Sequence, residues 1–153
     1  MAFEIAEIAV GGGVLGLCAL PQASDLTALQ AWRADLVLTL VEGPELAMLS
    51  PDLIDVFAAA GIAHCHFPIA DYATPRGDWR ILALKLHARL ATGSRIVIHC
   101  RGGCGRTGMI ALRLMVEAGE EAEPAVARLR AARPCAVETE AQMDWATRPE
   151  TAT

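Results

Sequence analysis

The segment from Arg95 to Ala118 constrains the fold of this chain more than any other part of the sequence. It begins with Arg95-Ile96-Val97-Ile98-His99, an apolar run of strand length, and passes through Cys100 into a turn rich in glycine. An apolar pattern with helical spacing then runs from about Arg106 to Ala118. A buried strand, a tight turn and a helix in this order predict an α/β layer protein, whose ligand crevice lies at the carboxyl ends of the strands.

The rest of the chain alternates between strand and helix patterns, which predicts a single domain over residues 1–153 with a central, mostly parallel mixed sheet of four to five strands flanked by helices. Glu42-Gly43-Pro44 is interpreted as a break, and Ser50 as the N-cap of a helix that Gly61 ends. We expect strands at residues 3–10, 14–19, 36–41, 62–67 and 95–99, and helices at about 25–33, 51–60, 78–91, 106–118, 120–133 and 138–147.

Composition narrows the possible partners. The 153 residues are 54% hydrophobic and 20% charged, with a net charge of -5. Binding to nucleic acid or to an anionic membrane surface requires a broad cationic face, so we expect neither partner. The uncharged stretch 8–20 follows Glu4 and Glu7 rather than basic residues and is interrupted by glycines, so it does not fit a signal segment.

The cysteines form an odd, scattered set without a CxxC pair: Cys18, Cys65, Cys100, Cys104 and Cys135. This pattern is typical of reduced intracellular thiols rather than of a disulfide framework, so it predicts a cytoplasmic location. His64 and His66 share one face of a predicted strand, but no spaced Cys/His pair matches a structural zinc motif. We therefore expect no metal and no cofactor.

Cys100 lies between the strand 95–99 and the helix that begins near Arg106. Backbone N–H groups that point inward around such a turn, together with the positive end of the helix, form a site for an anion. The same field stabilises a thiolate, because thiols at helix N-termini and near arginine have pKa values of roughly 3.5 to 7.5. The sequence therefore predicts a nucleophilic cysteine beneath a bound oxyanion.

The other residues of this turn each have a predicted part in the site. Glycines permit positive φ angles and a close approach of the backbone to a ligand. The planar fork of Arg106 can bind two oxygens of a phosphate group. Thr107 is expected to donate a hydrogen bond to the sulfur, and His99 to orient the loop. The predicted phosphate-binding residues are Arg101, Gly102, Gly103, Cys104, Gly105 and Arg106.

The run from His99 to Gly108 matches the pattern H-C-x-x-G-x-G-R-[ST]-G and resembles the signature of the protein tyrosine phosphatase superfamily, in particular its small dual-specificity members of the kinase-associated type. Three further segments are similar to that family: Leu15-Gly16-Leu17 resembles its amino-terminal strand, Pro68-Ile69-Ala70-Asp71-Tyr72-Ala73-Thr74-Pro75 its mobile general-acid loop, and residues 133–142 its late segment, where a Gln positions the hydrolytic water.

The resemblance implies a phosphatase that acts on phosphotyrosine, with some phosphoserine or phosphothreonine, through a phosphocysteine on Cys100. Asp71 would protonate the leaving oxygen and then activate water, and Gln142 would hold that water. The implied partner is a phosphorylated protein or peptide, and the oligomeric state is open. Two alternatives remain: a catalytically silent phosphate-binding module, and a thiol-based enzyme of arsenate or sulfur transfer.

Two residues depart from the family pattern. Cys104 stands where an apolar residue is familiar, and Cys135 where glycine often follows Arg-Pro. Cys104 either captures oxidised Cys100 as a disulfide or is a small apolar filler that faces the core. Arg128, Arg130 and Arg133 are interpreted as one solvated helix face.

Overall fold

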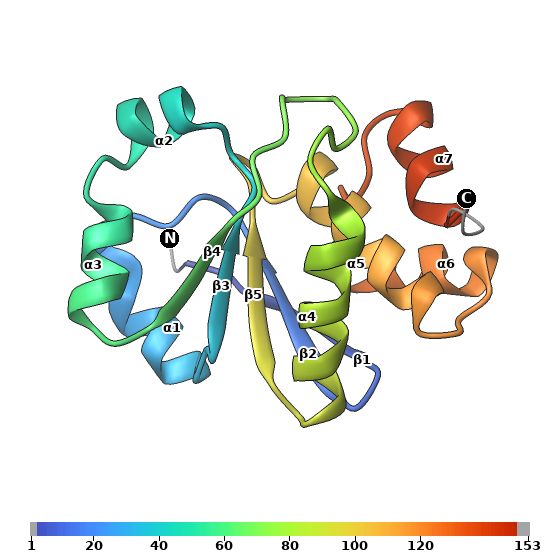
Figure 1. The fold of residues 1–153 in the computed structure, drawn as a ribbon, viewed down its shortest axis with the longest axis horizontal. Coiled ribbons are helices and arrows are strands. Elements are labelled where there is room, and N and C mark those ends of the chain that lie inside the picture. The colour runs from blue at the N-terminus through green and yellow to red at the C-terminus, as the bar shows by residue number, and fades with distance from the viewer. Residues whose placement is uncertain (1–2, 150–153) are drawn as a thin grey trace.

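The computed structural model describes residues 3–149 (Figure 1). Its centre is a five-stranded sheet in the order β1-β2-β5-β3-β4. The β1–β2 pair is antiparallel and the other pairs are parallel, so the predicted mostly parallel mixed sheet is confirmed. The strands are β1 (Ala6–Val10), β2 (Gly13–Cys18), β3 (Leu36–Thr39), β4 (Ala63–His66) and β5 (Arg95–His99).

The burial of the side chains matches the position of the strands in the sheet. All four residues of β3 and all but the first residue of β5 are buried, as expected of central parallel strands that are covered on both faces. β1 and β2 form a hairpin through Gly11 and Gly12, whose φ angles of 59° and 97° suit a tight turn. In the centre of the sheet Thr39 pairs with His66 on one side and with His99 on the other. These polar residues lie at the carboxyl ends of their strands.

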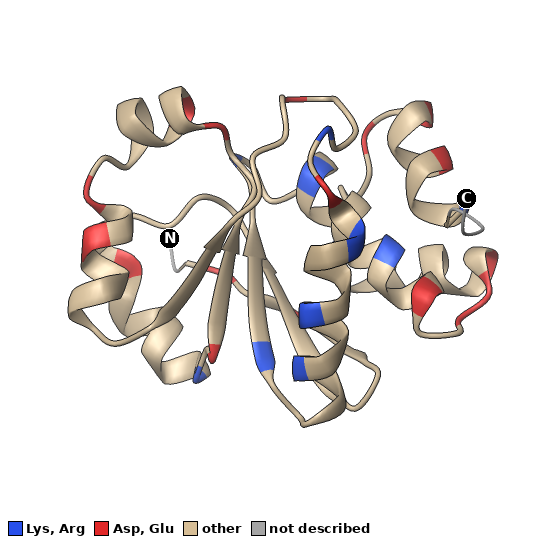
Figure 2. Cartoon of the chain, in the orientation of Figure 1, with Lys and Arg blue, Asp and Glu red and all other residues tan. Residues whose placement is uncertain are grey.

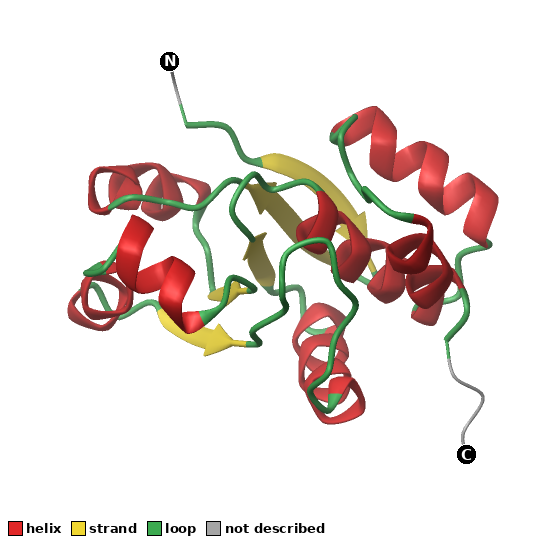
Figure 3. Ribbon diagram, turned by 90° about the horizontal axis from the view of Figure 1, so that it is seen from above, coloured by secondary structure: helices red, strands yellow, loops and turns green. Residues whose placement is uncertain are grey.

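Helices cover both faces of the sheet. Figure 3 shows α1, α2 and α3 on one side of the strands and α4 to α7 on the other. Figure 2 shows that acidic residues mark the α2–α3 side, whereas lysine and arginine lie along α4. The helices are α1 (Leu26–Trp32), which follows a 3-10 turn at Ala23–Asp25, α2 (Gly43–Leu49), α3 (Leu53–Ala59), α4 (Trp79–Ala91), α5 (Gly105–Glu117), α6 (Ala122–Ala132) and α7 (Glu140–Thr147).

The strand β3 ends before Glu42-Gly43-Pro44, as the predicted break requires, but the sequence missed the helix α2 that begins at Gly43. Pro44 lies in the first turn of α2, where its missing N–H costs nothing, and Glu42 and Glu45 form a capping box around that turn. Ser50 ends α2 and donates its hydroxyl to the Pro21 carbonyl at 2.9 Å, so it is not the predicted N-cap of α3. The predicted helix is accordingly shorter and begins after Asp52.

Helix α5 forms the centre of the α4–α7 side. Its residues from Gly105 to Met115 are all buried, which is typical of a helix packed on every face. It contacts β2 and β5 on one side and α6 and α7 on the other. In the part of the chain from residue 3 to residue 149, no helix has the length and apolar character needed to cross a membrane. The burial of α5 fixes the position of its N-terminus, where the glycine-rich turn ends.

Candidate active site

The phosphate loop, residues 100–106, connects the end of β5 to the start of α5. Four successive carbonyls of this loop accept hydrogen bonds from outside it: Arg101 from Leu20 N at 3.0 Å, Gly102 and Gly103 from the Arg133 guanidinium at 2.9 and 3.0 Å, and Cys104 from Val137 N at 3.2 Å. Carbonyls that point outward leave the inner side of the loop to N–H groups, and such a nest of N–H groups binds anions. These contacts fix the outer side of the loop.

Gly103 meets the requirement that the sequence predicted for a glycine. Its φ is 73°, a left-handed conformation that side chains disfavour. A Cβ atom at this position would overlap the Cys18 carbonyl at the end of β2. The loop can therefore lie against β2 only because residue 103 has no side chain.

A pocket of about 220 Å³ opens above this loop. Cys100, only 3% exposed, lies among its lining residues. The pocket brings together Cys100, Arg106 and Asp71, which the sequence predicted as nucleophile, phosphate ligand and general acid. The lining residues are Asp71, Tyr72, Cys100, Arg101, Gly102, Cys104, Gly105, Arg106 and Glu138.

The guanidinium of Arg106 is buried and held by Glu45. Its Nη1 donates to Glu45 Oε1 at 2.7 Å and to the Ile69 carbonyl at 2.8 Å, and its Nη2 donates to Glu45 Oε2 at 3.0 Å. These hydrogen bonds lower the pKa of Glu45. Nη2 also lies 3.4 Å from Asp71 Oδ1, while Nε has no partner among the described residues. Glu45 thus holds the Nη1–Nη2 end of the guanidinium, while Nε stays without a partner among the described residues.

Thr107 carries the second buried polar atom without a partner in residues 3–149. Its hydroxyl oxygen is fully buried in the first turn of α5, yet no described residue hydrogen-bonds to it. Buried polar groups are paired in the great majority of cases, so an exception needs an explanation. Here both exceptions, Thr107 Oγ1 and Arg106 Nε, belong to residues that the sequence assigned to the reaction.

His99 is part of a directed hydrogen-bond chain that ends at the Cys100 carbonyl. Its Nδ1 lies 3.2 Å from the Cys100 carbonyl, which can only accept, so Nδ1 carries a proton. Burial lowers the pKa of His99 to about 4, so the ring is neutral and Nε2 accepts from Thr39 Oγ1 at 2.7 Å. The Thr39 oxygen in turn accepts from His64 Nε2, also at 2.7 Å. The sequence missed this role of Thr39 and His64.

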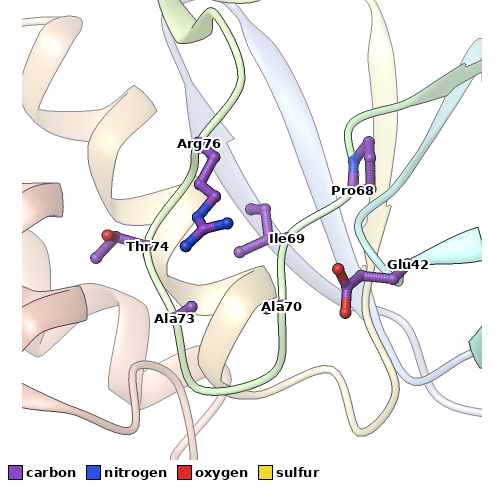
Figure 4. A pocket seen from close by; sticks show the side chains of 7 residues that line it. All are labelled: Glu42, Pro68, Ile69, Ala70, Ala73, Thr74 and Arg76. Atoms are coloured by element: carbon purple, nitrogen blue, oxygen red, sulfur yellow. The ribbon is translucent and has the colours of Figure 1, made fainter.

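The acid loop, residues 68–78, forms the opposite wall. Asp71 has a side chain that is 44% exposed, and its Oδ1 accepts from Tyr72 N at 3.1 Å. A second cavity of about 250 Å³ lies behind this loop, and Figure 4 shows the Arg76 guanidinium pointing between the two limbs of the loop. The acid loop therefore lies over open space, in contrast to the packed phosphate loop.

Gln142 lies beside the phosphate loop, since a Cβ atom at Gly105 would be 3.1 Å from its Oε1. It is fully buried, and its Oε1 accepts from Glu138 N at 2.9 Å and from Thr139 N at 3.2 Å. Its Nε2 donates to the Ala73 carbonyl at 3.3 Å. Gln142 therefore caps α7 and ties it to the acid loop, and it is absent from the lining of the catalytic pocket within residues 3–149.

A disulfide joins Cys104 to Cys135. Both interpretations of Cys104, as a partner of Cys100 and as an apolar filler, are therefore wrong, and so is the expectation that all cysteines are reduced. Cys18, Cys65 and Cys100 are free. The expectation of a solvated face is wrong for Arg133, which binds the carbonyls of the phosphate loop. Burial raises the pKa of Cys18 to about 12, so that thiol is protonated and inert.

Comparisons with known proteins agree with this geometry. The family model described as polymorphic toxin system, DSP-PTPase phosphatase, matches residues 15–120. Cyclin-dependent kinase inhibitor 3 of Rattus norvegicus is 30% identical over 123 residues, covering 72% of this chain and 58% of that protein. The corresponding protein of Mus musculus is 32% identical over 114 residues, covering 66% and 54%. The chain thus spans a little over half the length of these relatives.

Solved structures show the same fold. Kinase associated phosphatase with serine in place of its catalytic cysteine has a TM-score of 0.88 and 25% identity, covering 97% of this chain and 94% of that one. Tk-PTP in its active form has a TM-score of 0.75 and 30% identity, covering 91% and 92%. Because the family model matches more than half of the residues, this chain belongs to the dual-specificity group of the protein tyrosine phosphatase family.

Proposed function

We propose that this chain is a protein phosphatase that removes phosphate from phosphotyrosine, and also from phosphoserine or phosphothreonine, through a phosphocysteine on Cys100. One observation carries the proposal above all others: the two buried side-chain polar atoms without partners in residues 3–149, Arg106 Nε and Thr107 Oγ1, belong to the same sequence motif as the predicted nucleophile. A phosphate bound at the loop would pair with Arg106 Nε, and a thiolate on Cys100 would accept from Thr107. The substrate would therefore satisfy groups that the protein leaves open.

In the first step the Cys100 thiolate attacks phosphorus, and the bond from phosphorus to the substrate oxygen breaks. Arg106 can donate from Nε and Nη2 to two phosphate oxygens, while Glu45 holds the other edge of its guanidinium. The positive end of α5 stabilises the same charge. Asp71, 3.4 Å from Arg106, protonates the departing oxygen, so that an alcohol or phenol leaves rather than an anion.

In the second step water attacks the phosphocysteine, and the electron pair of the phosphorus–sulfur bond returns to sulfur. Asp71, now ionised, takes the proton of that water, and inorganic phosphate leaves. The hydroxyl of Thr107 stabilises the sulfur as it becomes a thiolate again. The same carboxyl group therefore serves both steps, as covalent catalysis with one acid–base residue requires.

The rival functions find less support. A silent phosphate-binding module would not need a candidate nucleophile and a candidate acid in the lining of one pocket. Arsenate or sulfur transfer on Cys100 would use a second nearby thiol, but Cys104 is bonded to Cys135. Protein substrates are supported by the matching relatives, one of which is a kinase associated phosphatase.

A phosphopeptide assay of the whole chain tests the proposal. The wild-type protein should release phosphate from phosphotyrosine peptides and give a burst of peptide product as the phosphocysteine forms. Cys100→Ser should lose turnover on the order of 10⁴-fold or more, yet still bind the peptide. Substantial turnover by Cys100→Ser, or phosphate release by wild type without a covalent intermediate on Cys100, would contradict the proposal.

A further inference from the structure

Helix α4 exposes an apolar stripe to solvent, although its opposite face is already buried in the core. The buried face consists of Trp79, Leu82, Ala83, Leu86 and Leu90. On the outer side, Ile81 is 56% exposed and Leu84 is 75% exposed. A spacing of three residues makes these two side chains neighbours on the helix, and Ala88, also exposed, continues the stripe for another turn. The outer face of a helix that only covers a sheet is polar, so this stripe is available to a partner.

Three exposed cations flank this stripe: Arg80 on one side, and Lys85 and Arg89 on the other, as the helical turn of about 100° per residue places them. Helix α4 has no acidic residue, and within residues 3–149 no carboxylate forms an ion pair with these three side chains. Figure 2 shows the blue bands of lysine and arginine along α4, in a chain whose net charge is -5. The α4 surface is therefore a cationic site with an apolar centre, and it consists of Arg80, Ile81, Leu84, Lys85, Ala88 and Arg89.

A groove of about 360 Å³ lies beside the stripe, between α4 and the end of α5, and is lined by Arg80, Ala83, Leu84, His87 and Glu117. Glu117 is the one carboxylate in this lining, and the protein already balances its charge. It accepts from Trp79 Nε1 at 2.9 Å, from His87 Nε2 at 2.9 Å and from Arg113 Nε at 2.8 Å. The groove therefore offers an apolar side chain a place to bind, while the cations of α4 stay available for carboxylates from outside.

The α4 surface is connected to the catalytic pocket through the acid loop. Helix α4 begins at Trp79, directly after that loop. A further cavity, of about 170 Å³, includes Pro75 of the acid loop and Arg80 of α4 in its lining. Arg80 thus lines both this cavity and the α4 groove. A polypeptide bound along α4 can therefore continue past the acid loop, whose Asp71 lines the catalytic pocket.

We propose that the α4 surface docks an acidic segment of the phosphorylated substrate protein, in which leucine or isoleucine side chains alternate with Asp and Glu. The apolar side chains of this segment cover Ile81 and Leu84, and its carboxylates pair with the three cations. Docking raises the effective concentration of the phosphorylated residue at the catalytic pocket. The occupant is a protein rather than an anionic membrane, because the site is a groove with three cations and not a broad cationic face. This role deepens the proposed function and rests on it.

The test uses three synthetic phosphotyrosine peptides with one common core: the core alone, the core linked to a Leu/Glu segment, and the core linked to the same segment with Lys in place of Glu. With wild type, the Leu/Glu peptide should have the highest kcat/KM, through a lower KM at unchanged kcat. Arg80→Glu/Lys85→Glu should lower this kcat/KM roughly 10-fold at low salt, and much less at high salt, because exposed charges are screened. The core alone should change by less than about twofold, since it does not reach α4. Arg33→Glu/Arg148→Glu, with the same change of charge at the ends of α1 and α7, is the matched control.

Two further measurements locate the contact. Leu84→Ala should lower kcat/KM for the Leu/Glu peptide by roughly two- to fivefold and leave the core unchanged, because it removes apolar contact area. Lys85 is the only lysine of the sequence, so a carbodiimide, which joins a carboxylate to an amine, should cross-link the Leu/Glu peptide to Lys85.

Three outcomes would overturn the inference: equal kcat/KM for the acidic and the basic extension with wild type, an equal loss for the core and the Leu/Glu peptide in Arg80→Glu/Lys85→Glu, or binding to phosphatidylserine vesicles that the same variant abolishes while the peptides show no difference. The last outcome would assign the surface to a membrane. Failure of the proposed function would look different, since wild type would then hydrolyse none of the three peptides.

Discussion

The phosphate loop and the acid loop meet at Arg106, but the protein holds them in opposite ways. Four successive carbonyls of the phosphate loop are bound from outside, and a disulfide fixes its residue 104. The acid loop carries an exposed Asp71 and a Tyr72 that is 60% exposed, and a cavity lies behind it. The one carbonyl of this loop that is tied to the phosphate loop is Ile69, which accepts from Arg106 at 2.8 Å.

This difference matches the chemistry proposed for the two loops. Stabilising a transition-state charge requires donors that are already in position, because rearranging them during the reaction costs free energy. A general acid must instead let a substrate enter and then approach its leaving oxygen, as mobile catalytic loops do. Glu45 and Asp71, two carboxylates on one guanidinium, represent the two tasks: Glu45 is a largely buried support and Asp71 an exposed reactant.

The largest effect in the acid loop should come from Asp71→Asn. Loss of the general acid should lower kcat by about 10²- to 10⁴-fold for substrates with poor leaving groups, and much less for activated aryl phosphates. The free energy of unfolding should change by less than about 0.5 kcal/mol, since the side chain is exposed. Rates across a series of leaving groups and urea unfolding measure both. A uniform loss across the series would count against Asp71 as the acid.

On the side of the phosphate loop, removal of the disulfide in the double variant Cys104→Ser/Cys135→Ser should lower the free energy of unfolding by about 3–4 kcal/mol. The bond closes a loop with a sequence separation of 31, and the estimate follows from the chain entropy of the unfolded state. Urea unfolding with and without a reductant measures it, and Cys65→Ser, at a free cysteine, is the control. Identical wild-type curves in both conditions would contradict the bond.

Glu45→Gln should show that Glu45 and Asp71 have different roles. Arg106 is 1% exposed and would keep its charge without its partner, so the free energy of unfolding should fall by about 2–3 kcal/mol, somewhat less than for a fully buried pair. The value of kcat/KM should fall as well, because the guanidinium loses its support. Asp55→Asn on the exposed face of α3 is the control. If Asp71→Asn lowered the free energy of unfolding and Glu45→Gln left it unchanged, the roles assigned to the two carboxylates would be wrong.

The smallest effect concerns His99, which supports the phosphate loop from the end of β5. Burial lowers the pKa of His99 from its ordinary value of 6.5 to about 4. Between these two pH values the His99 side chain binds a proton in the unfolded chain but not in the native state. The free energy of unfolding therefore falls as the pH falls. The expected loss from pH 6.5 to pH 5 is on the order of 2 kcal/mol.

Urea unfolding across this pH range measures the loss, and His99→Asn should flatten the slope. Glu45 does not interfere, because its lowered pKa contributes stability that is lost only below its ordinary pKa of 4.5. An unchanged slope in His99→Asn would assign the pH dependence to other groups.

The sequence predicted most of the fold because local patterns were strong. The apolar run 95–99, the glycine-rich turn and the apolar helix after Arg106 each constrain their own conformation, and Asp78 caps α4 as its position suggests, accepting from Arg80 N at 3.1 Å. The error at α2 has a local reason: Gly43-Pro44 suits a break and the first turn of a helix equally well, and only the capping box of Glu42 and Glu45 decides for the helix.

By itself the sequence predicted the residues of the proposed reaction, since Cys100, Arg106 and Thr107 belong to one short motif whose backbone geometry is local. It could not determine which distant residues support them. Glu45 reaches Arg106 across 61 positions, and Cys135 reaches Cys104 across 31. Such pairings depend on how helices and strands pack in three dimensions, and no short-range pattern in the chain records them.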